Sequence, residues 1–257
     1  MLLALAMITW SYGPAPQQHA ELRLPAGRGP FPVVVLIHGG CWIHYADAQY
    51  TSKIAAALTE PSAFTGQGWA TWNLEYRRAH EPGGGWPGTF RDVEAGVAAL
   101  RDAAKQHPLD LSRVVVMGHS AGGQLALYVG KRKPLPLRGI VSLGGIADMK
   151  IYAEKGPSGC AEGTPKVMGG RPDQVPERYA EVSPAELLPL GLPQVLIWGD
   201  KDTIVPERFF EAYEKRAQSA GDPVEIIRIP NAAHHELCNL DHPGWQQTLA
   251  ALRRLLH

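Results

Sequence analysis

Cysteine is scarce in this sequence, and neither sign of charge is in excess. The three cysteines, Cys41, Cys160 and Cys238, contain no Cys-x-x-Cys pair, so we expect buried thiols and neither a disulfide framework nor a zinc site. The 25 Lys and Arg residues balance 25 Asp and Glu residues, so no net field draws the chain to nucleic acid or to an anionic membrane. We therefore expect no nucleic-acid partner, no metal site and no cofactor.

A long hydrophobic run is also missing. The apolar stretch at residues 1–10 lacks the basic flank of a secretory signal and is far too short to span a bilayer, so it is expected to begin the chain at the surface as a helix or a strand. We expect a cytoplasmic protein, monomeric or homodimeric. A length of 257 residues with 45% hydrophobic content suffices for one large α/β core, and a single domain over residues 1–257 is predicted.

The sequence does contain a regular alternation of strand-like and helix-like segments. Residues 32–38 form a continuous apolar run, as expected of a strand in a parallel sheet that is covered on both faces. Residues 147–192 are rich in Pro and Gly with little periodicity, and they are expected to form a short cap-like insertion over the sheet's edge. The pattern predicts an α/β fold with an open, mostly parallel, doubly wound sheet, helices on both faces, and reactive groups at the carboxyl ends of the strands. Further strands are expected at 20–24, 69–76, 114–117, 139–143, 195–198 and 224–229, and helices at 49–59, 93–100, 124–131, 206–220 and 243–256.

A Gly-x-Ser-x-Gly pattern joins one predicted strand to the next predicted helix. The sequence Gly118-His-Ser-Ala-Gly-Gly follows the run Val114–Met117, and the glycines remove side chains that would crowd a serine on a sharp turn. This strand–turn–helix context predicts that Ser120 is a nucleophile. Neither phosphate-binding glycine pattern follows the strand at residues 32–38, so a nucleotide site is disfavoured.

A serine nucleophile needs an imidazole that takes its proton and a carboxylate that orients the imidazole. Asp200 and Asp202 follow the predicted strand at 195–198, and His234 and His235 follow the predicted strand at 224–229. The order Ser, Asp, His is the one expected on this fold. From the residues alone, the acid and the base each have two candidates.

Four motifs in this order resemble the α/β-hydrolase superfamily, and in particular its small esterases and formamidases, over essentially residues 20–256. They are His-Gly-Gly-Cys-Trp at 38–42, Gly-His-Ser-Ala-Gly-Gly at 118–123, Gly-Asp-Lys-Asp-Thr-Ile-Val-Pro at 199–206 and Ala-Ala-His-His-Glu-Leu at 232–237. The resemblance implies an acid at Asp202, with Asp200 as the alternative, and a base at His234, with His235 as the alternative. It also implies an oxyanion hole formed by the amides of Gly40, Cys41 and Ala121, with His38 bracing their loop.

The substrate is less well indicated. Trp42 and Tyr45 near the oxyanion loop, Trp86 after a triple glycine and Tyr152 in the insertion either wall a pocket for an acyl or aryl group or belong to the core. Arg77 and Arg78 follow a strand near the expected site, where they either meet a substrate carboxylate or pair with acidic residues such as Asp92 and Glu94.

The expected activity is that of a serine hydrolase that cleaves carboxylic esters of small to medium acyl or aryl groups through an acyl-enzyme. Its substrate is a small-molecule ester or amide. An arylformamidase is the alternative, because the His-Gly-Gly-x-Trp and Gly-His-Ser-Ala-Gly pair also resembles that group. A peptidase is less expected, because Ala121 follows the serine where Tyr is common in the prolyl-oligopeptidase group. A non-catalytic ligand receptor on the same scaffold is the remaining alternative.

Overall fold

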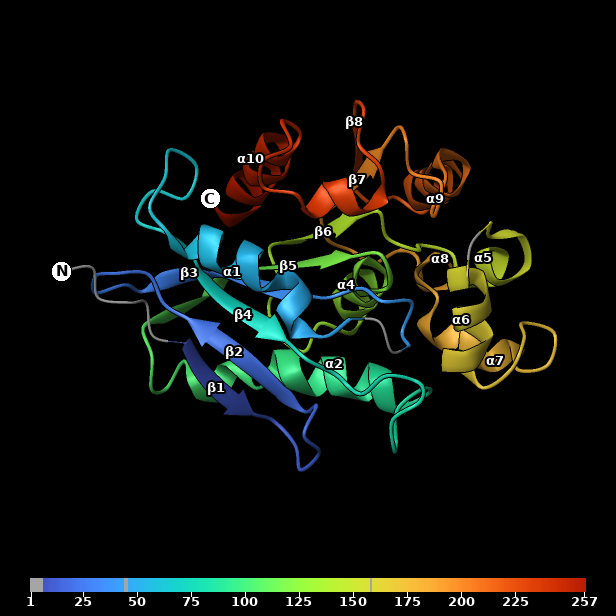
Figure 1. Cartoon of the computed structure of the whole chain (residues 1–257), viewed down its shortest axis with the longest axis horizontal. Helices are drawn as coiled ribbons and strands as arrows, with labels where there is room; N and C mark the ends of the chain where they lie inside the picture. Colours follow the sequence, from blue (N-terminus) through green and yellow to red (C-terminus); the bar gives the residue numbers. More distant parts are fainter. Residues whose placement is uncertain (1–6, 44–45, 158) are drawn as a thin grey trace.

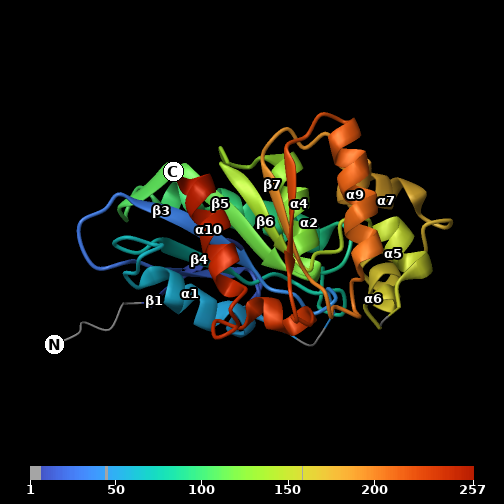
Figure 2. The same ribbon diagram turned by 90° about the horizontal axis from the view of Figure 1, so that it is seen from above.

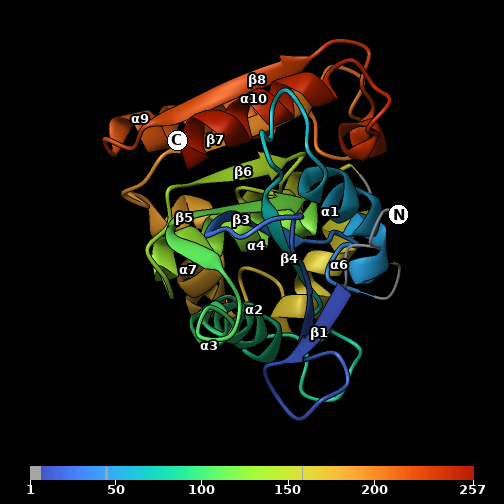
Figure 3. The same ribbon diagram turned by 90° about the vertical axis from the view of Figure 1, so that its left-hand side faces the viewer.

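A computed structural model describes residues 7–43, 46–157 and 159–257 of the chain, and an eight-stranded sheet lies at its centre (Figure 1). The strand order is β1-β2-β4-β3-β5-β6-β7-β8. Strand β2 pairs in antiparallel fashion with both β1 and β4, and all the other neighbouring pairs are parallel, as the sequence predicts for a mostly parallel sheet. Strands β1 and β8 form the two opposite edges (Figure 3). The strands are β1 Met7–Ser11, β2 His19–Arg23, β3 Phe31–Ile37, β4 Ala70–Leu74, β5 Leu109–His119, β6 Gly139–Leu143, β7 Gln194–Gly199 and β8 Val224–Ile229.

The central strands are buried along their length because helices cover both faces of the sheet. Every residue of β3, β4 and β6 is buried, which explains why β3 is a continuous apolar run, although β4 also buries the polar side chains of Thr71 and Asn73. Ile37 pairs with both Leu74 and Gly118 across the sheet. The residues that follow β3 and β4, and the last residue of β5, therefore lie side by side at one end of the sheet.

Helices cover both faces of the sheet (Figure 2), and a separate hydrophobic cluster lies on each face. Helices α1 (Ser52–Thr59) and α10 (Trp245–Leu256) pack on one face. On the other face lie α2 (Gly88–Ala98), α3 (Leu100–Ala103), α4 (Ala121–Arg132) and α9 (Glu207–Ser219). Two short 3₁₀ turns, η1 (Ala48–Thr51) and η2 (His234–Cys238), follow the ends of strands β3 and β8 in the chain.

The segment 147–192 contains four short helices where the sequence shows little periodicity. They gather at one side of the molecule (Figure 1), and α6 contains an internal proline, Pro165. Each has ten residues or fewer, which is too short for a clear helical repeat in the sequence. Their bounds are α5 Met149–Lys155, α6 Gly159–Met168, α7 Pro176–Val182 and α8 Pro184–Leu187.

The described part of the apolar stretch at residues 1–10 belongs to the edge strand Met7–Ser11, and residues 1–6 lie outside the described residues. The helix after the serine begins at Ala121, three residues earlier than the sequence predicts, and so it includes Gly122 and Gly123. Within the described ranges, none of the helices combines the length and the apolar character needed to cross a membrane.

Candidate active site

Ser120 lies on a sharp turn between β5 and α4. Its backbone has φ 57° and ψ −121°, which is a strained conformation for a residue with a side chain, and its N–H donates to the carbonyl of Leu143 over 2.8 Å. The flanking glycines make this turn possible. A Cβ added at Gly118 would lie 2.0 Å from the carbonyl oxygen of Gly122, and one added at Gly122 would lie 2.1 Å from that of Ile37.

His234 and Asp202 form a buried pair. The Nδ1 of His234 lies 2.7 Å from Oδ2 of Asp202, and the exposed fractions of the two side chains are 4% and 0%. The second oxygen of Asp202 accepts the N–H groups of Ile204 and Val205, each at 2.8 Å. A carboxylate held in this way accepts the Nδ1 proton, which leaves Nε2 of His234 as a proton acceptor.

The alternative residues make other contacts. Asp200 accepts the N–H of Asn231 at 2.7 Å and is exposed, as a turn residue is. His235 is exposed, and its Nδ1 lies 3.2 Å from the hydroxyl of Tyr50. The neighbouring residues cover part of the His235 ring, and this partial burial lowers its pKa, which the charge of His234 lowers further. Asp202 thus bonds to His234, while His235 bonds to Tyr50.

Ser120 and His234 lie near one another at the carboxyl ends of the central strands. Leu143, which accepts the Ser120 N–H, is followed by Gly144, and a Cβ added at Gly144 would lie 3.0 Å from Nδ1 of His234. The ring of His119, the residue before the serine, has its centroid 4.6 Å from that of His234. Three segments that are far apart in the sequence therefore converge at one point of the sheet edge.

The loop after β3 has an unusual backbone. Gly40, Cys41 and Trp42 have φ values of 102°, 55° and 58°, so three successive residues occupy the left-handed region that only glycine adopts freely. Surrounding contacts hold the loop in this shape. The carbonyl of Trp42 accepts the N–H of Ala79 at 2.9 Å, and its indole N–H donates to Oε1 of Gln124 at 2.9 Å.

Ala121 supplies the other amide predicted for the oxyanion hole. As the first residue of α4, it has an N–H group without an acceptor inside the helix, and the positive end of the helix dipole lies there. Gly39 packs against the neighbouring serine, since a Cβ at position 39 would lie 3.1 Å from Cβ of Ser120. The loop after β3 and the start of α4 therefore lie on either side of the serine.

A buried ion pair lies beneath the loop. The Nε2 of His38 is 3.2 Å from Oε1 of Glu75, and its Nδ1 is 2.8 Å from the carbonyl of Gly39. Both ring nitrogens face acceptors, which is the pattern of an imidazolium. Glu75 also accepts the N–H groups of Ala48, at 2.8 Å, and Tyr76, at 3.0 Å. His38 thus fixes the carbonyl of the residue that precedes the predicted oxyanion amides.

A disulfide joins Cys41 to Cys160, so the prediction of three thiols is wrong for this pair. The two residues are separated by 119 positions in the sequence, and only the fold brings their Cα atoms to 4.9 Å. Helix α6 packs directly on the loop here, because a Cβ added at Gly163 would lie 2.7 Å from the carbonyl of Cys41. Cys238 is a free thiol.

The predicted substrate-binding residues differ in where they lie. Trp42 is fully buried and bonded to Gln124, as a core residue is. Trp86 is partly buried, with the guanidinium of Arg178 4.6 Å above its ring. Tyr45 lies outside the described residues. Tyr152 is buried, and its hydroxyl donates to the carbonyl of Ile204 at 2.8 Å.

The two arginines after β4 are paired with acidic side chains. Arg77 makes a bidentate pair with Asp92, with both bonds at 2.7 Å. Arg78 bonds to Glu81 and to the carbonyl of Ala46, each at 2.6 Å. Both guanidinium groups are therefore engaged within the protein.

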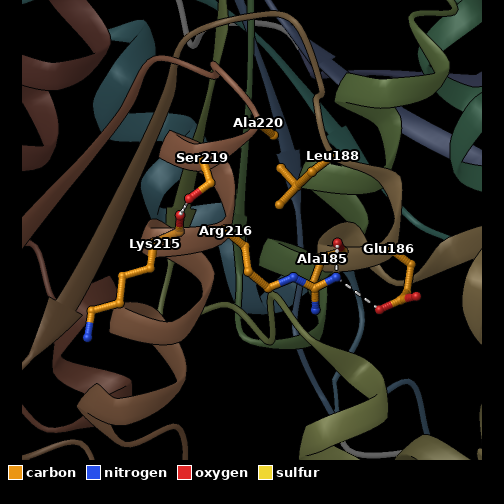
Figure 4. A pocket seen from close by; sticks show the side chains of 7 residues that line it. All are labelled: Ala185, Glu186, Leu188, Lys215, Arg216, Ser219 and Ala220. Atoms are coloured by element: carbon orange, nitrogen blue, oxygen red, sulfur yellow. Dashed lines mark hydrogen bonds and ion pairs between the residues drawn. The ribbon is translucent and has the colours of Figure 1, made fainter.

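Two pockets are relevant to the position of a substrate. A mainly apolar pocket of about 320 Å³ lies beside the loop after β3 and is lined by Ile43, Ala79, His80 and Lys166. A larger pocket of about 520 Å³ lies between α8 and α9 (Figure 4), and neither pocket is lined by Ser120, Asp202 or His234. The guanidinium of Arg216 in the larger pocket bonds to Glu186 and to the carbonyl of Ala185, as Figure 4 shows. It also bonds to Asp148.

Sequence reasoning missed three polar residues that shape this site, namely Tyr50, Glu75 and Gln124. A carboxylate at the end of a predicted strand was a usable signal for Glu75. Gln124 joins the indole of Trp42 to the carbonyl of Val182, and nothing in its local sequence points to that role. In the part of the chain that the structure describes, no cluster of three or more His, Cys, Asp or Glu side chains could hold a metal ion.

Comparisons with known proteins agree with this architecture. The model of the family described as BD-FAE matches residues 21–213. Esterase LipC of Mycobacterium tuberculosis is 24% identical over 241 residues, which are 87% of this chain and 58% of LipC. YtmA of Bacillus subtilis, named an uncharacterized peptidase, is 27% identical over 174 residues, which are 67% of each chain. The chain thus spans little more than half the length of LipC.

Solved structures show the same fold. A truncated carbohydrate esterase from gut microbiota superposes with a TM-score of 0.79 at 20% identity over 96% of each chain. A bacterial heroin esterase superposes with a TM-score of 0.78 at 22% identity over 99% of this chain and 84% of its own. These likenesses agree with the predicted α/β-hydrolase fold.

Proposed function

The chain belongs to the BD-FAE family and has the α/β-hydrolase fold, and on this premise we propose that it is a serine hydrolase that cleaves carboxylic esters. The observation that carries the proposal is the 2.7 Å bond between His234 and Asp202, made beside the strained turn of Ser120. Strain of this kind and a buried His–Asp pair are expected together where a serine is activated.

In the proposed mechanism, Nε2 of His234 takes the hydroxyl proton of Ser120 while the serine oxygen attacks the ester carbonyl. Asp202 keeps the imidazole in the required tautomer and stabilises its charged form. The imidazolium then gives the proton to the leaving alcohol, and an acyl-enzyme remains. Water, deprotonated by the same imidazole, attacks the acyl-enzyme and releases the acid and the free serine.

The developing negative charge needs donors that are already in place. We propose that the amides of Gly40, Cys41 and Ala121 supply them. The contacts of Trp42, the disulfide of Cys41 and the ion pair beneath the loop support this assignment, because they hold two of the amides rigidly in advance of the reaction. Removal of one such donor in other hydrolases lowers kcat by about 10²–10³-fold.

We propose small to medium acyl or aryl esters as substrates. The support is the apolar pocket of about 320 Å³ beside the oxyanion loop, which is at the lower end of the size range of small-molecule sites. We place the non-reacting part of the ester against Ile43 and Ala79, and we expect long acyl chains to be poor substrates.

The test is a panel of p-nitrophenyl esters of increasing acyl length, assayed with the wild-type chain and with Ser120→Ala. We expect turnover of the short esters and none above background with the variant. Hydrolysis that survives in Ser120→Ala would show that another residue does the chemistry.

Amide hydrolysis is the second candidate, because YtmA is named a peptidase and because formamidases share the motif pair. A formyl-aryl amide and an amino-acid p-nitroanilide, assayed beside the esters, distinguish the candidates. A kcat/KM for either amide above that of the best ester would assign the chain to amide hydrolysis.

The location proposed from the sequence is the cytoplasm. The Cys41–Cys160 disulfide favours an oxidising compartment instead, because structural disulfides are rare in the cytosol.

A further inference from the structure

The ring of His119 connects two segments of the site. His119 precedes Ser120, and its Nε2 lies 3.0 Å from the carbonyl oxygen of His234, which is 115 residues later in the sequence. Its other nitrogen, Nδ1, lies 3.2 Å from the hydroxyl of Tyr50. One buried side chain thus links the serine turn to the backbone of the proposed base.

The direction of each hydrogen bond follows from the chemistry of the partners. A carbonyl oxygen only accepts, so Nε2 of His119 carries a proton. Burial lowers the pKa of His119 well below its ordinary value, and the charge of His234 lowers it further, so the ring is neutral and Nδ1 is an acceptor. Burial also raises the pKa of Tyr50, so its hydroxyl keeps the proton that it donates to His119. The Tyr50 oxygen in turn accepts from Nδ1 of His235 at 3.2 Å.

Two carboxylates anchor the turn that carries Tyr50. It lies in η1, whose first N–H, that of Ala48, donates to Glu75 at 2.8 Å. Asp47 caps the same turn by accepting the N–H of Gln49 at 2.9 Å. The carboxylate that pairs with His38 beneath the oxyanion loop therefore also anchors the turn that carries Tyr50.

We propose that His119 and Tyr50 are positioning residues that hold the base against the serine. The inference rests on the proposed function. Asp202 fixes Nδ1 of the His234 ring, and the η2 turn has bonds of its own, such as that of the Ala233 N–H to Glu236. The His119 N–H adds a bond from the serine turn to the carbonyl of His234, so both the ring and the backbone of the proposed base are fixed by neighbouring elements. A displacement of about 1 Å in a reacting group lowers the rate by about 10²-fold.

Two matched variants separate positioning from packing. His119→Gln keeps an N–H donor at the place of Nε2, whereas His119→Asn is too short to reach the carbonyl and retains polar atoms only near Nδ1. With a short p-nitrophenyl ester we expect kcat to fall by about 10–100-fold in His119→Asn and by less than about fivefold in His119→Gln, with KM within about twofold in both. Tyr50→Phe keeps the ring that stacks on His119 and removes the donor, and an intermediate loss of kcat is expected.

Tyr213→Phe is the control for the loss of a buried tyrosine hydroxyl. Its hydroxyl donates to Oε1 of Gln194 at 2.7 Å, remote from the site, so we expect a lower Tm and an unchanged kcat. Equal losses of kcat in His119→Gln and His119→Asn would overturn the proposal, as would wild-type kcat in His119→Asn. If either His119 variant fails to fold, an unchanged kcat in Tyr50→Phe overturns the proposal and a reduced kcat with constant KM supports it.

Failure of the proposed function looks different. In that case the wild-type chain shows no ester hydrolysis that depends on Ser120, whatever the residue at position 119. If hydrolysis depends on Ser120 and the two His119 variants are equivalent, only the positioning inference fails.

Discussion

Replacement of Glu75 by Gln tests how far the buried ion pair supports the site. The carboxylate accepts three donors, namely His38 Nε2, the N–H of Tyr76 and the N–H of Ala48. An amide group must place an NH₂ where one oxygen was, so one of these donors then faces another donor. His38 also loses its counter-ion.

The expected effect is large because the pair is shielded from solvent. The exposed fractions are 0% for the side chain of His38 and 5% for that of Glu75. Removal of one partner from such a pair lowers the free energy of unfolding by about 3–5 kcal/mol. Because the same pair supports the predicted oxyanion amides, we also expect kcat for a short ester to fall by about 10²-fold.

Urea unfolding at pH 7 and initial rates measure the two effects. Glu225→Gln is the matched control, since Glu225 pairs with Arg254 at the surface, where a pair contributes less than about 1 kcal/mol. A Glu75→Gln protein that unfolds within about 1 kcal/mol of wild type, with more than half of its kcat, would refute this reasoning.

The pH dependence gives a second check on Glu75. Burial by itself raises its pKa, but the hydrogen bond and charge of His38 and two backbone N–H groups outweigh it and hold the pKa below the ordinary value of 4.5. A lowered pKa in the folded state stabilises the fold above the unfolded pKa, and this contribution is lost as the pH falls through the folded value. The difference in unfolding free energy between wild type and Glu75→Gln should therefore shrink as the pH falls below about 4.5. A constant difference down to pH 3 would contradict this account.

Three further predictions concern the base, the serine turn and the disulfide. His234→Ala should lower kcat by about 10³-fold or more, and His235→Ala by much less; the reverse order would move the base to His235. Gly122→Ala should destabilise the protein by at least about 3 kcal/mol in thermal or urea unfolding, because the added Cβ would lie 2.1 Å from the carbonyl oxygen of Ile37 in β3. Gly159→Ala is the control: a Cβ at position 159 meets no atom within 4 Å, so stability should change by less than about 1 kcal/mol. Cys160→Ala should remove about 2–5 kcal/mol, because the disulfide closes a long loop, and a reductant should lower the Tm of wild type but not that of the variant.

The sheet was predictable because the local sequence of its central strands indicates buried β-structure. Continuous β-branched runs such as Val33–Val35 and Val114–Val116 have no stable alternative to a sheet covered on both faces, and all of these residues are fully buried. The helices of segment 147–192 were not predictable as helices. They are short, and their contacts with the rest of the fold determine their conformation more than their local periodicity does. The single-domain and cap predictions for this chain remain predictions.

The candidate site was predictable where a local motif fixes the geometry. The glycines around Ser120 and the strand-end carboxylates locate the serine and the acid to within a residue or two, and resemblance supplied the rest. The contacts of Glu75 with Ala48, of Tyr50 with His119 and of Gln124 with Trp42 span 27, 69 and 82 residues, so no local pattern could show them. The disulfide is a similar case, since two isolated cysteines become neighbours only through the packing of α6.

Labelling with a fluorophosphonate tests the central claim most directly. The reagent forms a stable adduct only with a serine whose proton is removed by a nearby base, so peptide mapping by mass spectrometry identifies the nucleophile itself. We predict one adduct, on Ser120, in the folded wild-type chain, and none in Ser120→Ala. An unlabelled wild-type protein, or an adduct on another residue, would contradict the account.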